Sequence, residues 1–352
     1  MNTVAAPLHV IAHPLSTQSI GSLSARSDRL AGPFLLSSET GCSYPIAAGI
    51  SALFDKVYGE QYHRSVTKNP HSVQRSIEEG SWVACVYTGQ NGDVVAHGAL
   101  LRNQGSDRLA RVLVDESARG LGLGEKLTDT LLSHADRFCD QGEAPIVTES
   151  VTAHHGTQRI FAKAGFRPLG LLVSKFNDYF NTGYRESAVL MGRAVTTSAE
   201  AVFVSSAIAP IVKEIFKWHG ITTKVRTGRD RCGTALSSHK NSGVSFAFDE
   251  HMRIARLALG GGADLNNLEG LVNQARVANP SFIELKIEIS TPDGYAIAKK
   301  ALTNQFTFAG VEPHRDGVWL LLQQASNIAQ RAAALTFASE EANYLQSIIA
   351  KG

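Results

Sequence analysis

The chain has 352 residues, of which 43% are hydrophobic and 19% are charged, and its formal net charge is +2. This length and composition are typical of a soluble globular protein with two domains of ordinary size. The small net charge gives no electrostatic reason to expect a nucleic acid or an anionic membrane as a partner. No apolar run approaches the roughly 20 residues that are needed to span a bilayer.

The four cysteines, Cys42, Cys85, Cys139 and Cys232, are widely separated and include no C-x-x-C pair. This spacing argues against a zinc site and against a disulfide framework, and it is consistent with a reducing compartment. We therefore expect a cytoplasmic protein without a metal site.

The first part of the chain predicts alternating strands and helices. We expect residues 1–30, which contain no acidic side chain before Asp28, to form a flexible N-terminal arm. Apolar spacing and turn residues then predict a strand over 33–38, a helix over 44–58, a short helix over 72–79, and two strands over 81–87 and 94–100. Asn91-Gly92 between the last two predicts a hairpin turn.

A glycine-rich turn then joins a strand at 111–114 to a helix. Glycines alternate at Gly120, Gly122 and Gly124, and apolar residues recur at helical spacing from Leu123 onward. Glycine permits positive φ and lets a ligand approach the backbone, and the first N–H groups of a helix attract anions. The turn therefore predicts a phosphate or pyrophosphate site, although tight packing of the helix on the strand would also favour glycine here.

The residues around these glycines exclude two common phosphate loops. A Walker loop ends in Gly-Lys-Ser/Thr, whereas Gly124 is followed by Glu125-Lys126-Leu127. A dinucleotide fingerprint needs G-x-G-x-x-G, and here the third glycine falls one residue early, which disfavours a Rossmann oxidoreductase. The segment Arg119-Gly120-Leu121-Gly122-Leu123-Gly124 instead resembles the acetyl-CoA loop, Arg/Gln-x-x-Gly-x-Gly/Ala, of the GCN5-related N-acetyltransferase (GNAT) superfamily.

A second segment resembles the same family at the family's usual separation. A predicted strand over 144–151 is followed by a short helix that closes on Ala162-Lys163-Ala164-Gly165-Phe166. In GNAT proteins an Asn opens this helix and a Tyr precedes the Lys-x-Gly-Phe ending. Here His154 and Phe161 stand at those two positions.

The resemblance implies a GNAT fold over residues 31–195, with a central mixed β-sheet flanked by helices, and acetyl-CoA or another acyl-CoA as co-substrate. The backbone of Val112, Leu113 and Val114 would pair with the pantetheine arm. The amides of Arg119 through Glu125 would bind the pyrophosphate. His154 and Phe161 would contact the cofactor.

The residues that handle protons are less clearly marked. Glu149 is the first candidate for the general base, and His154 and His155 are the next. Phe161 lacks the hydroxyl of the family's tyrosine, so another group must protonate the thiolate or the thiolate leaves as the anion. The candidates for this acid are Tyr184, Ser150 and Thr152, and the candidates for lining the acceptor pocket are Tyr179, Phe180 and Tyr184.

The second half partly repeats the first. After a linker near 196–200, the segments 251–271, 282–289, 296–302 and 308–313 align by eye with the loop, strand and helix pattern described above, and 317–323 is a closing strand. Residues 200–324 therefore resemble a degenerate GNAT domain, in which Asp264 would repel a pyrophosphate. We expect this half to be catalytically silent and residues 325–352 to form a C-terminal helix.

The sequence thus predicts an N-acyltransferase that moves a short acyl group from CoA directly to an amine within a ternary complex. The acceptor would be an amine of a small molecule or a protein. A non-catalytic acetyl-CoA sensor is the alternative function, and a homodimer is left open.

Overall fold

The computed structural model describes residues 30–59, 65–102, 106–138, 145–179, 182–228 and 243–351. Residues 1–29 of the predicted arm over 1–30, together with Cys139, Phe180 and Cys232, lie outside these residues. In the first half the elements are β1 (Ala31–Leu36), α2 (Tyr44–Tyr58), α3 (Ser65–Lys68), α4 (Pro70–Glu78), β2 (Trp82–Thr88), β3 (Val94–Leu101), β4 (Asp107–Val114), a 3₁₀ turn (Glu116–Ala118), α5 (Leu123–Phe138), β5 (Ile146–Val151), α6 (Gly156–Lys163), β6 (Arg167–Phe176) and β7 (Glu186–Arg193).

The second half has a similar mixture of strands and helices. Its elements are β8 (Ala201–Val204), α7 (Ala209–His219), β9 (Lys224–Thr227), β10 (Val244–Asp249), β11 (Ile254–Leu259), α8 (Leu265–Ala278), β12 (Phe282–Glu288), α9 (Pro292–Thr303), β13 (Thr307–His314), β14 (Gly317–Gln324), α10 (Ile328–Ala333) and α11 (Glu340–Ile349). The helix α7 and the strands β8 and β9 were not anticipated from the sequence.

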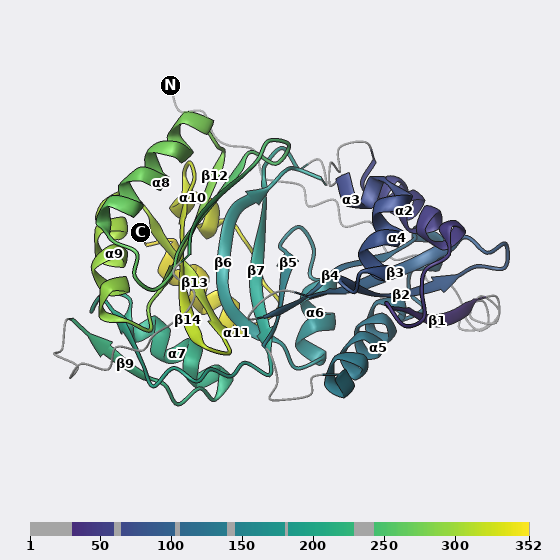
Figure 1. The fold of residues 1–352 in the computed structure, drawn as a ribbon, viewed down its shortest axis with the longest axis horizontal. Helices are drawn as coiled ribbons and strands as arrows, with labels where there is room; N and C mark the ends of the chain where they lie inside the picture. The colour runs from purple at the N-terminus through teal and green to yellow at the C-terminus, as the bar shows by residue number, and fades with distance from the viewer. Residues whose placement is uncertain are drawn as a thin grey trace, which may run out of the picture.

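One mixed sheet runs through both halves (Figure 1). Its strands follow the order β1-β2-β3-β4-β5-β7-β6-β13-β14-β12-β11-β10, and β8 and β9 form a separate parallel pair. The predicted mixed sheet flanked by helices is therefore confirmed. The predicted domain boundaries stay a prediction. In the structure the described strands of the two halves are joined edge to edge in one sheet.

The halves meet where β6 lies antiparallel to β13. The registered pair there is Gly170 opposite Gly310. A β-carbon on Gly170 would lie 2.3 Å from the carbonyl oxygen of Ala309, and one on Gly310 would lie 2.5 Å from that of Leu169. Side chains do not fit at this contact, so glycine on both strands lets the two backbones pair.

The strand pairings on the two sides of the β6–β13 contact, here called the seam, follow the same order. On one side β7 joins β6 to β5 by antiparallel pairing, and β5 lies parallel to β4. On the other side β14 joins β13 to β12 by antiparallel pairing, and β12 lies parallel to β11. The two parallel pairs differ in extent, because β11 and β12 are registered from Ile254 to Leu259 whereas β4 and β5 are registered only at Asp107 and Arg108.

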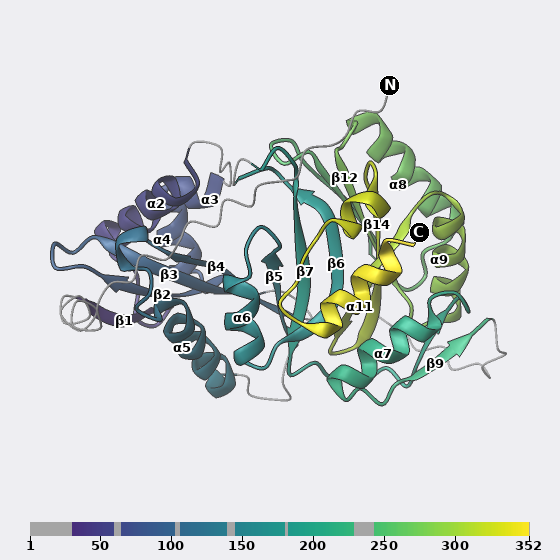
Figure 2. The same cartoon turned by 180° about the vertical axis from the view of Figure 1, so that it is seen from behind.

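Helices cover both faces of the first half. α2 and α4 pack on one face, in a core that includes Ile50, Phe54 and Ile77. α5 and α6 pack on the other face, where Leu127, Leu131 and other apolar residues at helical spacing form their core contacts. Figure 2 shows α5, α6 and α11 together on this second face.

The C-terminal segment corrects one prediction. Instead of one helix it forms α10 and α11, separated by a turn in which Phe337 is buried. Ser339 begins α11 and accepts a hydrogen bond from the amide of Ala342, which is the contact expected of an N-cap serine. Both helices pack on β6 of the first half, and the amide of Ala338 donates to Gln158 of α6 at 3.1 Å.

Candidate active site

The strands β4 and β5 separate next to a bulge in β4. Between the pairs His97–Leu113 and Ala99–Ala110 the strand β4 contains one residue more than β3, and Arg111 there has φ of 61°. The buried His97 ring donates from Nδ1 to the Arg111 carbonyl at 3.0 Å, and burial lowers the pKa of His97 to about 4. The neutral His97 therefore holds the backbone of the bulge in place through this hydrogen bond.

Beyond Arg108, the described parts of β4 and β5 have no further registered pairs, so their carboxyl ends diverge. The sequence interpretation placed a gap between the strands ending near Val114 and Glu149, and the structure has a gap at this place. Backbone groups along β4 from Leu109 to Val114 thus face an edge that β5 does not occupy.

The glycine turn lies at the end of the same strand. Gly120 and Gly122 have φ of 82° and 70°, and a β-carbon on either would meet no atom within 4 Å. The helix α5 starts at Leu123, so the amides of its first turn have no intrahelical acceptor. The amide of Arg119 differs from the rest, because it donates to the carbonyl of Glu116 at 3.2 Å.

Other residues of the turn have structural roles. Leu123 is buried in the core beneath α5, and Glu125 accepts from Lys163 of α6 at 2.8 Å. A β-carbon on Gly124 would lie 2.8 Å from Ile160, so this glycine allows α5 to approach α6. Close packing therefore explains Gly124, whereas the open space beside Gly120 and Gly122 is what an anion would need.

A cavity of about 140 Å³, here called the split cavity, occupies the space where the strands separate. It is lined by Phe54, Tyr58, Arg108, Ala110, Arg111, Val112, Thr148, Glu149, Val151, Thr157, Phe161, Phe176 and Tyr179. Of the residues predicted to contact pantetheine, Val112 therefore lines the cavity, whereas the Leu113 side chain is buried toward α2 and Val114 packs toward α5.

Phe161 and Thr157 come from α6, one turn apart on the same side of the helix. Phe161 is buried against Phe166, with ring centroids 5.6 Å apart. The Thr157 hydroxyl lies 2.7 Å from that of Ser150. Thr157 is thus the side chain of α6 that brings a hydroxyl to the cavity, next to the position where the family's tyrosine is replaced by Phe161.

Glu149 lines the split cavity as expected, but it is engaged in two ion pairs. Its Oε1 accepts from Arg108 at 2.6 Å and from Lys175 at 3.0 Å. Burial alone would raise the pKa of this carboxyl, but the charges of Lys175 and Arg108 outweigh burial and hold the pKa far below its usual range. A carboxylate held in this way is a weak proton acceptor at neutral pH, which argues against the predicted role of Glu149 as general base.

His154 lies beside the loop. Desolvation and, after it, the positive charge of Arg119 lower the pKa of His154. His154 does not line the split cavity, so its position suits contact with a cofactor better than proton transfer at the cavity.

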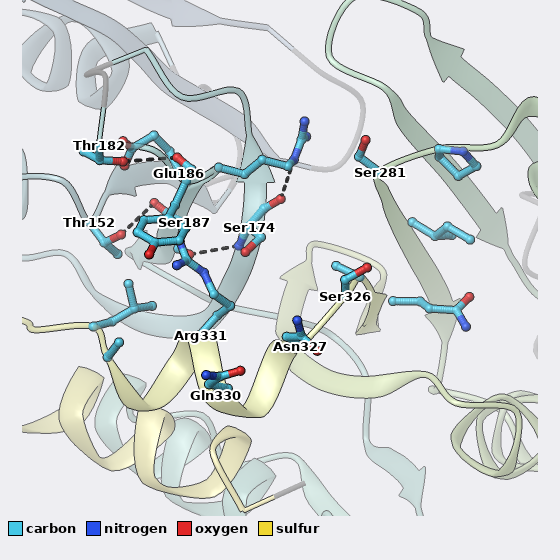
Figure 3. Close-up of a pocket in the computed structure, with 18 of the residues that line it drawn as sticks. Thr152, Ser174, Thr182, Glu186, Ser187, Ser281, Ser326, Asn327, Gln330 and Arg331 are labelled. Atoms are coloured by element: carbon cyan, nitrogen blue, oxygen red, sulfur yellow. Dashed lines mark hydrogen bonds between the residues drawn. The ribbon is translucent and has the colours of Figure 1, made fainter. Parts of the chain in front are cut away.

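Tyr184 lies in a different hollow, here called the polar cleft. This cleft has a volume of about 1180 Å³ and lies between the β6–β7 hairpin, α10 and the start of β12 (Figure 3). The Tyr184 side chain is half exposed beneath the guanidinium of Arg331, 3.8 Å from its ring centroid. The predicted acid Tyr184 therefore does not line the split cavity, and Tyr179 is the loop tyrosine that does.

The polar cleft contains a buried carboxyl, Glu186, whose side chain is hydrogen-bonded to Thr182 (Figure 3). Its Oε1 has no hydrogen-bond partner among the described residues. Burial, reinforced by the charge of Asp178, raises the pKa of Glu186 to about 7. No feature of the sequence pattern distinguished this glutamate.

Comparison with known proteins agrees with this geometry. Residues 54–176 match the family model described as Acetyltransferase (GNAT) domain. Residues 54–176 form a GNAT domain. This segment contains the bulged strand, the glycine turn and α6, and it includes every residue that lines the split cavity except Tyr179.

Solved structures with similarity to the chain include three acyltransferases. The ribosomal-protein-S18-alanine N-acetyltransferase from Escherichia coli is 16% identical, covers 46% of this chain and 93% of its own, and has a TM-score of 0.36. An acyl-CoA N-acyltransferase from Pseudomonas aeruginosa is 20% identical, with coverages of 47% and 99% and a TM-score of 0.33. A phosphinothricin acetyltransferase from Sinorhizobium meliloti in complex with AcCoA is 15% identical, with coverages of 46% and 88% and a TM-score of 0.34.

Among the described residues, His, Cys, Asp and Glu form no group of three or more that could hold a metal ion. No helix within the described ranges is long and apolar enough to cross a membrane.

Proposed function

We propose that the first half is an acyl-CoA-dependent N-acetyltransferase that moves an acetyl or other short acyl group from CoA to an amine. The observation that carries this proposal is the glycine turn with open space in front of it, directly after a strand whose neighbour diverges. The turn suits a pyrophosphate, and the unpaired edge of β4 suits the amide groups of pantetheine.

The turn would hold the pyrophosphate through backbone amides. The amides from Gly120 to Glu125 and the positive end of the α5 dipole favour a negative charge. The amide of Arg119 is already used, so the Arg119 side chain rather than its backbone would contribute. The open space at Gly120 and Gly122 is consistent with a ligand close to the main chain.

The bulge in β4 would serve the acyl group. An N–H within Arg111–Leu113 would donate to the thioester carbonyl oxygen and stabilise the negative charge that develops when the amine attacks. His97 holds the Arg111 carbonyl in place and so keeps the bulged backbone in one orientation. The amine would attack from within the split cavity.

The departing thiolate would accept a hydrogen bond from the hydroxyl of Thr157, and it would take up the proton that the attacking amine loses or leave as the anion. Phe161 has no proton to give, and Thr157 is the neighbouring hydroxyl on α6 that lines the cavity. Ser150 lies within hydrogen-bond distance of Thr157 and would accompany it. Glu149 would keep its charge and hold Arg108 and Lys175 at the cavity wall rather than accept a proton.

We further infer that residues 200–324 are a degenerate GNAT domain that binds no CoA. The order of parallel and antiparallel pairings on the two sides of the seam supports this assignment. The long ladder between β11 and β12 leaves no opening for a pantetheine arm.

A non-catalytic acetyl-CoA sensor remains the alternative function, because Phe161 lacks the hydroxyl of the family's tyrosine. Calorimetric titration with acetyl-CoA tests binding, and release of free thiol in the presence of an amine panel tests catalysis. We expect binding together with amine-dependent thiol release. Binding without thiol release on any amine would favour the sensor, and absence of binding would overturn both proposals.

A further inference from the structure

A second cavity adjoins the split cavity at the seam between the halves. This seam cavity has a volume of about 400 Å³ and shares Arg108, Glu149 and Phe176 with the split cavity. Its remaining wall comes mostly from β10, β11 and β12 of the second half. A molecule in the seam cavity would therefore lie next to the place where the acyl group is proposed to sit.

Small side chains on the strands of the second half make room for this cavity. Ser245 lies opposite Ala258 on neighbouring strands, and Ala247 lies opposite Arg256. Ser245, Ala247 and Ala258 all line the cavity, and none of them fills it. The volume is within the range of small-molecule pockets, which favours a compact ligand over a folded protein surface.

The buried charges around the cavity neutralise one another. Lys175 contacts both Glu149 and Glu284, at 3.0 and 2.5 Å. Lys286 lies 2.6 Å from Glu312, and Arg108 lies 2.6 Å from Glu149 and 3.9 Å from Glu312. Three cations thus face three carboxylates, and burial of these charges is tolerable because each has an opposite partner.

Arg256 adds a cation to this balanced set. It is 37% exposed, and its carboxylate partner Asp249 lies 4.0 Å away, at the limit of an ion pair. The guanidinium faces the seam cavity and is close enough to Glu149 to lower the pKa of that group. An arginine offers a planar pair of donors that matches a carboxylate.

We infer that the seam cavity receives the acceptor, and that the acceptor is a small amine carrying a carboxylate or similar anionic group, which Arg256 binds. This inference rests on the proposed acyl transfer. The amine of such a molecule would point past Glu149 into the split cavity, with its acid group toward the second half. The second half would then contribute to acceptor specificity although it binds no CoA.

The test compares matched amines that differ only in charge. Thiol release from acetyl-CoA is measured with L-amino acids, β-alanine and 4-aminobutanoate, each beside its own amide. We expect at least one acid to react with a kcat/KM about 10-fold or more above that of its amide, because the amide lacks the charge that pairs with arginine. Arg256→Ala should lower kcat/KM for the acid by about 10-fold through KM and leave the value for the amide unchanged.

Arg276→Ala is the matched control, because Arg276 belongs to the same half but lines the polar cleft. It should leave the ratio of acid to amide unchanged, and acetyl-CoA should bind both variants as it binds the wild type. Equal rates for acids and amides, equal losses on both in Arg256→Ala, or turnover confined to polyamines or protein amines would overturn the inference. Acetyl-CoA binding without thiol release on any amine would instead contradict the proposed catalysis, and this inference with it.

Discussion

The two parallel strand pairs of the sheet differ in whether they remain joined. β11 and β12 are paired along the full length of β11, whereas β4 and β5 are joined only at Asp107 and Arg108 and then diverge beside a bulge. The strand order around the two pairs is the same. The neighbouring ladders differ as well, because β4 carries one residue more than β3 at its bulge whereas β10 and β11 pair without an irregularity.

The turns that follow β4 and β11 differ in the same sense. In the second half the amide of Gly261 donates to the Glu288 carboxylate at 2.8 Å, and Asp264 caps α8 by accepting from the amide of Asn267 at 2.9 Å. Side-chain carboxylates thus occupy donors that a phosphate would need. Open space at the β-carbon is common to both turns, at Gly120 and Gly122 in the first half and at Gly262 in the second, so the turns differ in the carboxylates that occupy amide donors.

The largest expected effect comes from placing a carboxylate in the open turn. Gly122→Glu should weaken acetyl-CoA binding by 100-fold or more, which corresponds to about 2.7 kcal/mol. The reason is repulsion between the new carboxylate and the negative charges of the pyrophosphate. Gly262→Glu is the matched control, because Gly262 also has positive φ and open space at its β-carbon. Calorimetry should show loss of binding in the first variant only, and equal effects of the two substitutions would refute the contrast between the turns.

The next effect concerns the ion pairs that keep the wall of the split cavity together. Glu149→Gln should lower the free energy of unfolding by about 3 kcal/mol at pH 7, because Arg108 and Lys175 lose a shared partner. The pKa of Glu149 is depressed in the folded state, so this difference should be fully present above the ordinary glutamate pKa and should shrink as the pH falls below it. Urea unfolding at pH 7 and pH 4 measures both.

If Glu149 were instead the general base, the same substitution would abolish turnover while leaving stability nearly unchanged. Glu39→Gln, on an exposed turn of the first half, serves as the control and should change neither property.

A smaller effect is expected at the leaving group. Thr157→Val removes the hydroxyl with little change of shape and should lower kcat by about 10-fold, or about 1.4 kcal/mol, with little change in acetyl-CoA affinity. Thr130→Val on α5 is the control, since Thr130 is half-buried and its hydroxyl donates to the carbonyl of Lys126. Unchanged turnover in Thr157→Val would exclude Thr157 from the transfer step.

The smallest effect is expected in the turn of the second half. Asp264→Ala removes the cap of α8 and should cost about 1 kcal/mol of unfolding free energy. Because β11 and β12 stay paired, the freed amides should not create a second CoA site, and calorimetry should still give one site per chain. A second binding event would show that the carboxylate alone keeps this half silent.

The sequence predicts the elements whose signals are local. The bounds of α2 agree with the prediction because Pro45 suits the first turn of a helix and Gly59 suits its end. The glycine turn and α6 are also recognisable, since each is a short run of residues in a family pattern. The prediction of one helix over residues 325–352 is wrong, because Ser339 starts a second helix inside a run whose apolar residues recur at helical spacing.

The environment of the site depends on contacts between residues that are far apart in the sequence, and the spacing of residues along the chain does not reveal such contacts. Glu149 looks like a free carboxylate at a strand end until Lys175 and Arg108 are placed beside it. Lys175 in turn is neutralised by Glu284, which lies 109 positions further along the chain. Tyr184 and Tyr179 belong to the same short loop, and only the fold separates the one that lines the split cavity from the one that does not.

The glycine contact between Gly170 and Gly310 has a consequence for dividing the protein. A fragment that ended near residue 195 would leave β6 as an open edge, and unpaired edges invite association between copies. It would also leave Lys175 and Arg108 without Glu284 and Glu312. The smallest working unit is therefore expected to be the whole chain, although the matched GNAT segment occupies a minor part of it.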